Sequence, residues 1–248
     1  MNEFENKVFC CDNLELLGKL PNSHVNLIYC DILYGTGRNF GDYQDLPPDK
    51  AIILSHYEPR LKEMKRVLSE NGTIYLQMDY RISHWIHCLM DDVFGYDNLR
   101  NEIIWHYNSA PRRKFDLGDR HDTILRYSRT DKYKFNPVRE PYSLSAPRGY
   151  EKEKYYNNGG KVIGDVWSIN ILGQNDKTER VGYATQKPLE LIKRIISLSS
   201  DEGDIVADFY CGSGTTLVAA KQLNRKYLGC DINMVALNKV TERLEKNG

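Results

Sequence analysis

Apolar residues recur along the chain in two spacings, which distinguish strands from helices. Short runs rich in Val, Ile, Leu, Tyr and Cys are typical of buried strands. Longer segments with an apolar residue at every third or fourth position are typical of helices with one buried face. The pattern predicts strands at 8–11, 25–30, 73–78, 101–107, 121–128, 204–209 and 227–230. It predicts helices near 14–20, 51–69, 81–94, 215–223 and 233–245 and one starting at 188.

Capping and helix-breaking residues set the expected ends of these helices. Asp12 or Asn13 can cap the first helix, because short polar side chains accept hydrogen bonds from free backbone N–H groups. Pro59 is expected to kink the second helix or to start its second half. Asn71 and Gly72 are expected to end that helix in a left-handed conformation.

Strands separated by helices predict an α/β fold with a doubly wound, mostly parallel sheet. Such sheets bind ligands at the carboxyl ends of their strands. The length of 248 residues is near the upper end for one hydrophobic core. We therefore expect one domain with an irregular insertion between two regular halves.

Composition narrows the class further. The chain has 34 basic and 34 acidic residues, which excludes a uniformly basic coat. Residues 110–154 nevertheless carry a net charge of +5 together with aromatic residues. This stretch is either a solvated loop face or a surface for an anionic polymer. No membrane-spanning run or secretory signal is visible, and the six cysteines form no C-x-x-C pair. They indicate reduced, buried thiols of a cytoplasmic protein.

Residues 208–216 offer the strongest candidate for ligand chemistry. They read Asp-Phe-Tyr-Cys-Gly-Ser-Gly-Thr-Thr and join a predicted strand to a predicted helix. The two glycines allow a ligand to approach the backbone, and the helix start supplies free N–H groups. Asp208 places a carboxylate at the strand tip, suited to a cationic amine. The third glycine of the dinucleotide fingerprint is replaced by Leu217, which disfavours a nucleotide-dependent oxidoreductase.

Two further strand ends carry carboxylates. Asp231 ends the strand that follows the glycine loop, about twenty residues beyond its glycines, where a carboxylate can bind both hydroxyls of a ribose. It could also simply cap the helix that follows. Asp31, Ile32, Leu33 and Tyr34 follow the second strand and lead into a glycine-rich turn. Alone, this four-residue signal is weak.

Together these segments resemble the circularly permuted β class of S-adenosylmethionine-dependent amino-group DNA methyltransferases. The specific parts of the resemblance are the loop at 208–216 and the Thr185-Gln186-Lys187-Pro188 segment. Further landmarks lie at 8–34, 71–75 and 120–128, so the resemblance covers nearly the whole chain. It implies a Rossmann-like methyltransferase sheet with an irregular basic insertion for DNA recognition. Residues 1–135 would be the catalytic half, 136–184 the target-recognition insertion and 185–248 the cofactor-binding half.

The resemblance also implies roles for individual residues. The family's catalytic D-P-P-Y is here Asp31-Ile32-Leu33-Tyr34. Asp31 and the Ile32 carbonyl would accept the two hydrogens of an exocyclic amine, and Tyr34 would stack on the base. The cofactor, S-adenosylmethionine, would be bound by Asp12, Lys187, Asp208, Phe209, Tyr210, Gly212, Ser213, Gly214, Thr215, Thr216, Asp231 and Ile232.

The predicted reaction is methylation of adenine N6 in double-stranded DNA after base flipping. Cytosine N4 is the nearest alternative, and a relative that binds cofactor or DNA without catalysis is another, because both prolines of the motif are missing. Phosphate contacts are expected from Arg112, Arg113, Lys114 and Arg120. His121-Asp122 either orients a loop near the DNA or is purely structural. No metal is expected, and the resemblance allows a homodimer and a cognate restriction endonuclease as partners.

Overall fold

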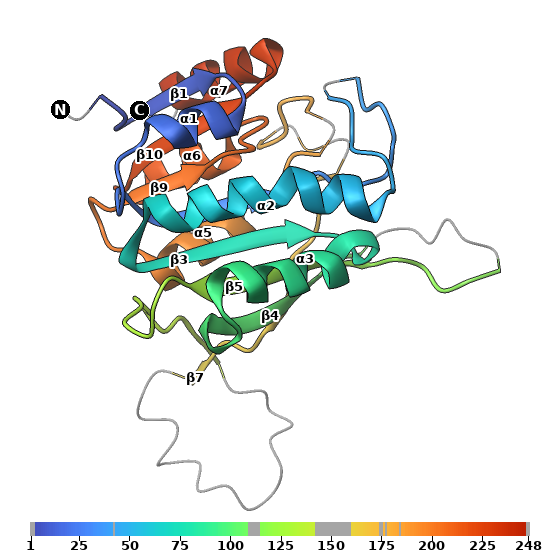
Figure 1. The fold of residues 1–248 in the computed structure, drawn as a ribbon, viewed down its shortest axis with the longest axis horizontal. Coiled ribbons are helices and arrows are strands. Elements are labelled where there is room, and N and C mark those ends of the chain that lie inside the picture. Colours follow the sequence, from blue (N-terminus) through green and yellow to red (C-terminus); the bar gives the residue numbers. More distant parts are fainter. Residues whose placement is uncertain are drawn as a thin grey trace, which may run out of the picture.

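The computed structural model describes residues 3–41, 43–108, 115–141, 160–173, 176, 178–183 and 185–246. Its centre is an eight-stranded sheet with the strand order β1-β10-β9-β2-β3-β5-β4-β8 (Figure 1). The strands are β1 (Lys7–Cys10), β2 (Val25–Asp31), β3 (Leu68–Met78), β4 (Leu99–His106), β5 (His121–Ser128), β8 (Val166–Ser168), β9 (Ile205–Asp208) and β10 (Lys226–Asp231). The helices are α1 (Asn13–Lys19), α2 (Lys50–Val67), α3 (Tyr80–Phe94), α5 (Leu189–Ser199), α6 (Thr215–Gln222) and α7 (Met234–Lys246).

Most neighbouring strands run parallel, as the alternation of strands and helices predicted. The exception is β5, which is antiparallel to both β3 and β4. The expected α/β fold is therefore confirmed. Within the segment at 136–184, β6 (Arg139–Glu140) pairs with β7 (Lys161–Val162), and β8 joins the edge of the main sheet beside β4. The described part of this segment thus contains three short strands.

Side chains of the central strands alternate between two apolar cores. In β2, Ile28 and Cys30 contribute to a core with α1, α2 and α3, which cover the front face in Figure 1. Leu27 and Tyr29 point to the opposite face, where α5 and α6 pack. Successive residues of a strand face opposite sides of the sheet, so a continuous apolar run is expected where helices cover both faces.

The expected end of the second helix is wrong. α2 is a single helix from Lys50 to Val67 that contains Pro59, and the next residue is already extended. Gly72 lies within β3 and has no positive φ. A Cβ at this position would lie 2.9 Å from the Asn26 carbonyl oxygen, so close packing against β2 is what requires glycine here.

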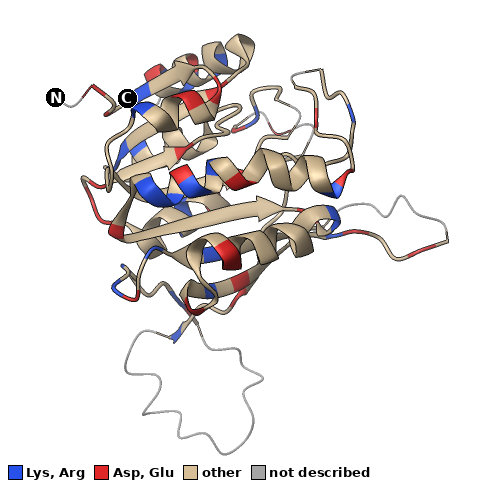
Figure 2. Cartoon of the chain, in the orientation of Figure 1, with Lys and Arg blue, Asp and Glu red and all other residues tan. Residues whose placement is uncertain are grey.

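The surface shows both charge signs side by side. On the face in Figure 2, Lys and Arg alternate with Asp and Glu over the front helices, as zero net charge suggests.

Two of the six cysteines, Cys10 and Cys88, are exposed, so the expectation that all are buried is wrong. Cys10 ends the edge strand β1, which has a neighbour on one side only. Across the described part of the chain, no helix is both long and apolar enough to cross a membrane.

Candidate active site

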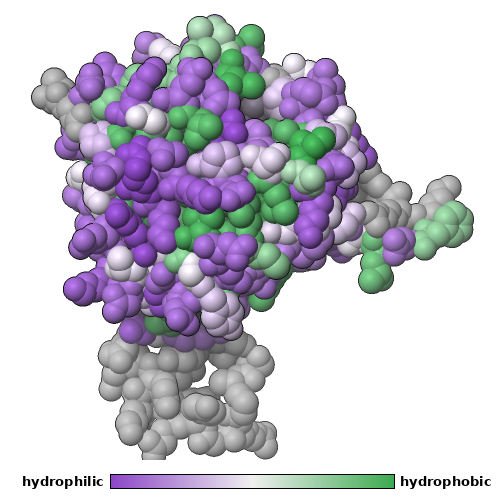
Figure 3. Space-filling model, viewed as in Figure 1, coloured by the Kyte–Doolittle hydropathy of each residue, from purple (hydrophilic) through white to green (hydrophobic). Residues whose placement is uncertain are grey.

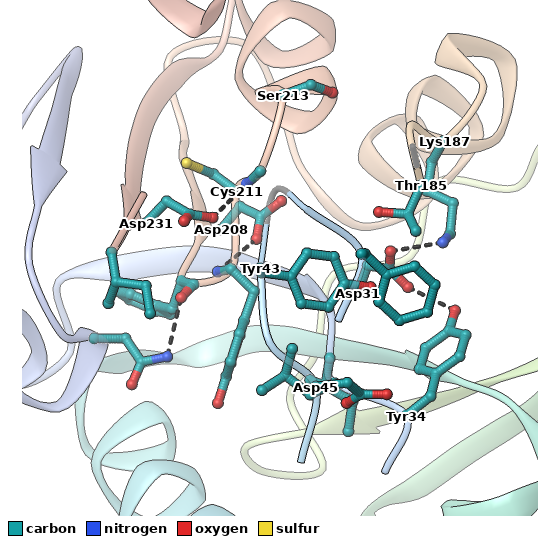
Figure 4. Close-up of a pocket in the computed structure, with 18 of the residues that line it drawn as sticks. Asp31, Tyr34, Tyr43, Asp45, Thr185, Lys187, Asp208, Cys211, Ser213 and Asp231 are labelled. Atoms are coloured by element: carbon teal, nitrogen blue, oxygen red, sulfur yellow. Dashed lines mark hydrogen bonds and ion pairs between the residues drawn. The ribbon is translucent and has the colours of Figure 1, made fainter. Parts of the chain in front are cut away.

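Three carboxylates from different parts of the chain meet in one cavity. Asp31, Asp208 and Asp231 end β2, β9 and β10, which are adjacent in the sheet. The carboxyl ends of parallel strands lie at one edge, so the three side chains line the same cavity of about 330 Å³ (Figure 4). The topology thus brings together Asp31 and the distant loop at 208–216.

The glycine loop is shaped to hold a ligand against its backbone. Gly212 and Gly214 have φ angles of +47° and +76°, which glycine adopts without strain. A Cβ at Gly212 would lie 3.1 Å from the Tyr183 ring, another part of the cavity wall. The backbone N–H of Gly212 donates to Asp231 at 2.9 Å, which ties the loop to the end of β10.

Asp208 is buried beneath this loop, and the pKa of its carboxyl group is raised. Burial raises its pKa to about 7, and the charges of Asp31 and Asp231 push it in the same direction. Thr216 Oγ1 and the Tyr210 N–H donate to this carboxylate, at 2.5 and 3.0 Å, and oppose the rise in pKa. A cavity with three carboxylates suits a cationic ligand, which would favour their ionised forms.

Asp31 is held by two donors, one on each oxygen. The Tyr34 hydroxyl donates to Oδ1 at 2.7 Å, and the Lys187 ammonium donates to Oδ2 at 2.6 Å (Figure 4). Burial raises the pKa of Asp31, whereas Lys187 and Tyr34 act to lower it. The ammonium also lies 5.5 Å from the centre of the Tyr34 ring. Lys187 therefore links the segment before α5 to the carboxylate at the end of β2.

The segment after β2 has no proline, yet other contacts fix its backbone. The Ile32 side chain is buried in the core, and its N–H donates to the Gln77 carbonyl at 3.1 Å. The Leu33 carbonyl accepts a hydrogen bond of 2.9 Å from the Tyr57 hydroxyl of α2. Downstream, the Asp45 carboxylate accepts hydrogen bonds from the backbone N–H groups of Gly35 and Thr36. These contacts supply the rigidity that proline φ angles would provide.

Removing the Tyr57 hydroxyl is expected to loosen this segment. Tyr57→Phe keeps the buried ring and deletes only the hydrogen bond to Leu33, so folding should be largely preserved. We expect kcat to fall by about 2- to 10-fold, as for the loss of one neutral hydrogen bond. Steady-state rates of the methyl transfer that the sequence resemblance implies, together with melting curves of both proteins, test this. An unchanged kcat would show that the contact does not position the segment.

The structure gathers most of the predicted site residues. Those lining the cavity are Asp12, Asp31, Ile32, Tyr34, Lys187, Asp208, Phe209, Tyr210, Gly212, Ser213, Thr215, Thr216, Asp231 and Ile232. Gly214 packs behind the loop, where a Cβ would lie 2.7 Å from Val240. The Phe209 ring belongs to the apolar core, and the Ile232 side chain is largely exposed. Asp12 caps α1 and pairs with Arg60 at 2.7 Å.

Of the four expected DNA contacts, the structure describes Arg120, which does not line the cavity. Arg120 is exposed and directly precedes β5, and the described residues 115–120 project from the body of the protein (Figure 1). Two apolar side chains of this projection, Phe115 and Leu117, are almost fully exposed to solvent (Figure 3). The predicted contacts Arg112, Arg113 and Lys114 lie outside the described residues.

Sequence reasoning missed several side chains around the cavity. Asn13 and Arg60 join α1 to α2, and the buried Asp45 organises the loop that follows Tyr34. No local pattern indicated these contacts, since each links distant segments. Asp122 was noticed beside His121, but its carboxylate points inward, and its Oδ2 lies 2.9 Å from the Tyr34 hydroxyl as a second possible acceptor.

Comparison with known proteins defines the class. The family model of the N6/N4 DNA methylases matches residues 25–242. The chain is 34% identical to the type II methyltransferase M1.MboII of Moraxella bovis, over 98% of each chain. It is 31% identical to the DNA adenine methyltransferase YhdJ of Escherichia coli, over 94% of this chain and 81% of that protein.

Solved structures share the fold at lower sequence identity. The M1.HpyAVI complex with SAM superimposes with a TM-score of 0.67 at 21% identity, covering 96% of this chain and 98% of that one. The cytosine-N4-specific PvuII DNA methyltransferase gives a TM-score of 0.69 at 15% identity, covering 98% and 92%. The protein is a DNA amino-methyltransferase that uses S-adenosylmethionine. It belongs to the N6/N4 DNA methylase family.

Proposed function

We propose that this protein transfers the methyl group of S-adenosylmethionine to the N6 amine of a flipped adenine in duplex DNA. The observation that carries the proposal is the single cavity shared by Asp31 and the loop at 208–216. The relative YhdJ is a DNA adenine methyltransferase, which supports adenine as the target. The aspartate that begins the tetrapeptide, a tendency of adenine enzymes in the family, supports it as well.

Asp31 and the residues that follow it can activate a weak amine. The N6 lone pair is conjugated with the adenine ring and is a poor nucleophile. Asp31 would accept one amine hydrogen and the Ile32 carbonyl the other, which favours a pyramidal nitrogen with an available lone pair. Positive charge develops on this nitrogen during transfer, and the Asp31 carboxylate stabilises it. The Tyr34 ring would stack on the flipped base and return about 1–3 kcal/mol of the flipping cost.

The loop residues suit the proposed cofactor. S-adenosylmethionine supplies an electrophilic methyl group on a positively charged sulfur. Asp231 would bind the ribose hydroxyls, and Asp208 would face the cationic part of the molecule. Asp12 would bind near the adenine ring of the cofactor. The open backbone at Gly212, with Tyr183 opposite, leaves room for a ligand at close range.

The edge of the sheet that holds the cavity also offers a place for DNA. Arg120 directly precedes β5, and the described residues 115–120 project beyond the same edge (Figure 1). We propose that Arg112, Arg113, Lys114 and Arg120 contact phosphates and that residues 136–184 recognise the target sequence. The type II relatives support a cognate restriction endonuclease as a partner, and we propose a homodimer as the assembly.

Replacing Lys187 is expected to change the pH dependence of the reaction. Asp31 must be ionised to accept the amine hydrogen, so the rate falls as the pH drops through its pKa. Lys187→Met removes the cation that lowers this raised pKa, and the pKa therefore rises further. We expect the acid limb of the kcat profile to move to higher pH. Lys62→Met, at an exposed lysine of α2, should leave the limb in place. Identical acid limbs in wild type and Lys187→Met would refute this role.

Identification of the product nucleoside tests the proposed function. The protein is incubated with labelled S-adenosylmethionine and mixed-sequence duplex DNA, and the DNA is digested to nucleosides. Label in N6-methyl-2′-deoxyadenosine supports the proposal. Label on N4 of cytosine would support the alternative that the PvuII likeness keeps open. Cofactor binding without any transfer would favour an inactive relative.

A further inference from the structure

Each carboxylate oxygen of Asp31 accepts one hydrogen bond in the structure. Oδ1 accepts the Tyr34 hydroxyl and Oδ2 accepts the Lys187 ammonium. The proposed function, on which this inference rests, requires Asp31 to accept a hydrogen of the target amine. A carboxylate oxygen has two lone pairs, so the amine hydrogen competes with these two donors for Asp31, and it binds most strongly where a donor hydrogen can turn away.

The Tyr34 hydroxyl has a second acceptor within hydrogen-bonding distance, so it is the donor that can turn away from Asp31. Its hydroxyl lies 2.9 Å from Asp122 Oδ2 and 2.7 Å from Asp31 Oδ1, and it has only one proton to share between them. Rotation of the O–H bond alone would transfer the hydrogen bond from one carboxylate to the other. Lys187, by contrast, makes an ion pair with Asp31 that helps to keep it ionised.

Burial and two further hydrogen bonds hold the Asp122 carboxylate in place as this acceptor. Its side chain is buried in β5, and two further groups donate to it: Gln77 Nε2 at 2.8 Å and the Tyr107 hydroxyl at 3.1 Å. The Tyr29 hydroxyl donates to Gln77 Oε1 at 2.7 Å, which fixes the amide so that its NH₂ group faces Asp122. These groups come from β2, β3 and β5 and from the residue after β4, so neighbouring strands of the sheet hold the carboxylate.

We infer that Asp122 is a positioning residue that receives the Tyr34 hydroxyl when the target amine binds Asp31. The exchange removes the Tyr34 hydrogen from Asp31 Oδ1, so that this oxygen can accept the amine hydrogen more strongly. It also keeps the Tyr34 hydroxyl hydrogen-bonded in a buried site, where an unpaired polar group would be costly. The Tyr34 ring need not move, so the aromatic surface proposed for base stacking is retained.

Kinetics of Asp122→Asn test the inference. The substitution keeps the shape of the side chain but removes the charge that attracts the hydroxyl. We expect kcat to fall by about 10- to 100-fold, with KM for S-adenosylmethionine and for DNA changed less than 3-fold. Asp91→Asn is a matched control, because Asp91 accepts a hydrogen bond of 2.6 Å from Tyr127 outside the cavity. It should leave kcat unchanged.

A double-mutant cycle with Tyr34→Phe separates this role from a structural one. Tyr34→Phe keeps the ring and has no hydroxyl to transfer, so Asp122→Asn should cost less than 3-fold in that background. The same loss of kcat in both backgrounds would overturn the inference, as would an unchanged kcat in Asp122→Asn. A wild-type protein that methylates neither base would instead overturn the proposed function.

A second measurement needs no substitution at Asp122 and covers the case in which that variant fails to fold. The acid limb of kcat/KM reports the free enzyme and that of kcat reports the substrate complex. The groups that face Asp31 and shift its pKa are Lys187, Tyr34 and Asp122. Tyr34→Phe should move the acid limb of kcat/KM to higher pH and leave that of kcat in place. Equal shifts of both limbs would contradict the inference.

Discussion

Asp31→Asn is expected to lower kcat by about 10²- to 10³-fold, the size of effect seen when one group that stabilises the transition state is removed. The neutral amide cannot balance the positive charge that develops on the amine nitrogen. It also offers an NH₂ group where the carboxylate has an acceptor. Single-turnover methylation of duplex DNA measures this loss directly.

Cofactor binding should survive the same substitution. Asp31 lies at the end of β2, whereas the proposed cofactor contacts come mainly from the loop at 208–216 and from β10. We expect the dissociation constant for S-adenosylmethionine to change less than 5-fold in a calorimetric titration. Asp49→Asn serves as a control, because asparagine also caps helices well and Asp49 only caps α2. Normal turnover by Asp31→Asn would refute the role of this carboxylate.

Asp231→Ala is expected to weaken binding of S-adenosylmethionine by about 1–3 kcal/mol, or about 5- to 150-fold in the dissociation constant. In the proposed function this side chain binds the ribose hydroxyls, and in the structure it accepts hydrogen bonds from the N–H groups of Gly212 and Asn233. Its loss removes a ligand contact and one support of the glycine loop.

Equilibrium titration of cofactor into the folded variant measures the effect of Asp231→Ala. Asp231→Asn separates the two contributions, because the amide oxygen can still accept one of the two backbone hydrogen bonds. It should bind more tightly than the alanine variant and more weakly than wild type. An unchanged dissociation constant in both variants would count against the ribose contact.

The sequence predicted the fold well where elements are long and periodic. Alternating strands and helices sufficed to place Asp31, Asp208 and Asp231 at one edge, because parallel strands share the direction of their ends. The glycine loop was predictable because its residues are consecutive. Local patterns failed at Gly72, whose role depends on packing against β2. Glycine after a helix commonly adopts positive φ, but α2 ends before that position.

The rest of the site depends on contacts between segments that are distant in sequence. The ion pair of Lys187 with Asp31 spans more than 150 residues, and Asp122 reaches Tyr34 from the far side of β3. The contact of Tyr57 with Leu33 likewise links a helix to a strand end. Such contacts have no signature in a single sequence, since many other arrangements of the same residues would satisfy the hydrophobic pattern equally well.

A crystal structure with bound S-adenosylmethionine would test most directly whether one cavity serves both the amine and the cofactor. We expect the cofactor between the loop at 208–216 and the end of β2, with its ribose on Asp231 and its methyl group facing Asp31. Cofactor bound elsewhere, or with its methyl group directed away from Asp31, would contradict the proposed reaction.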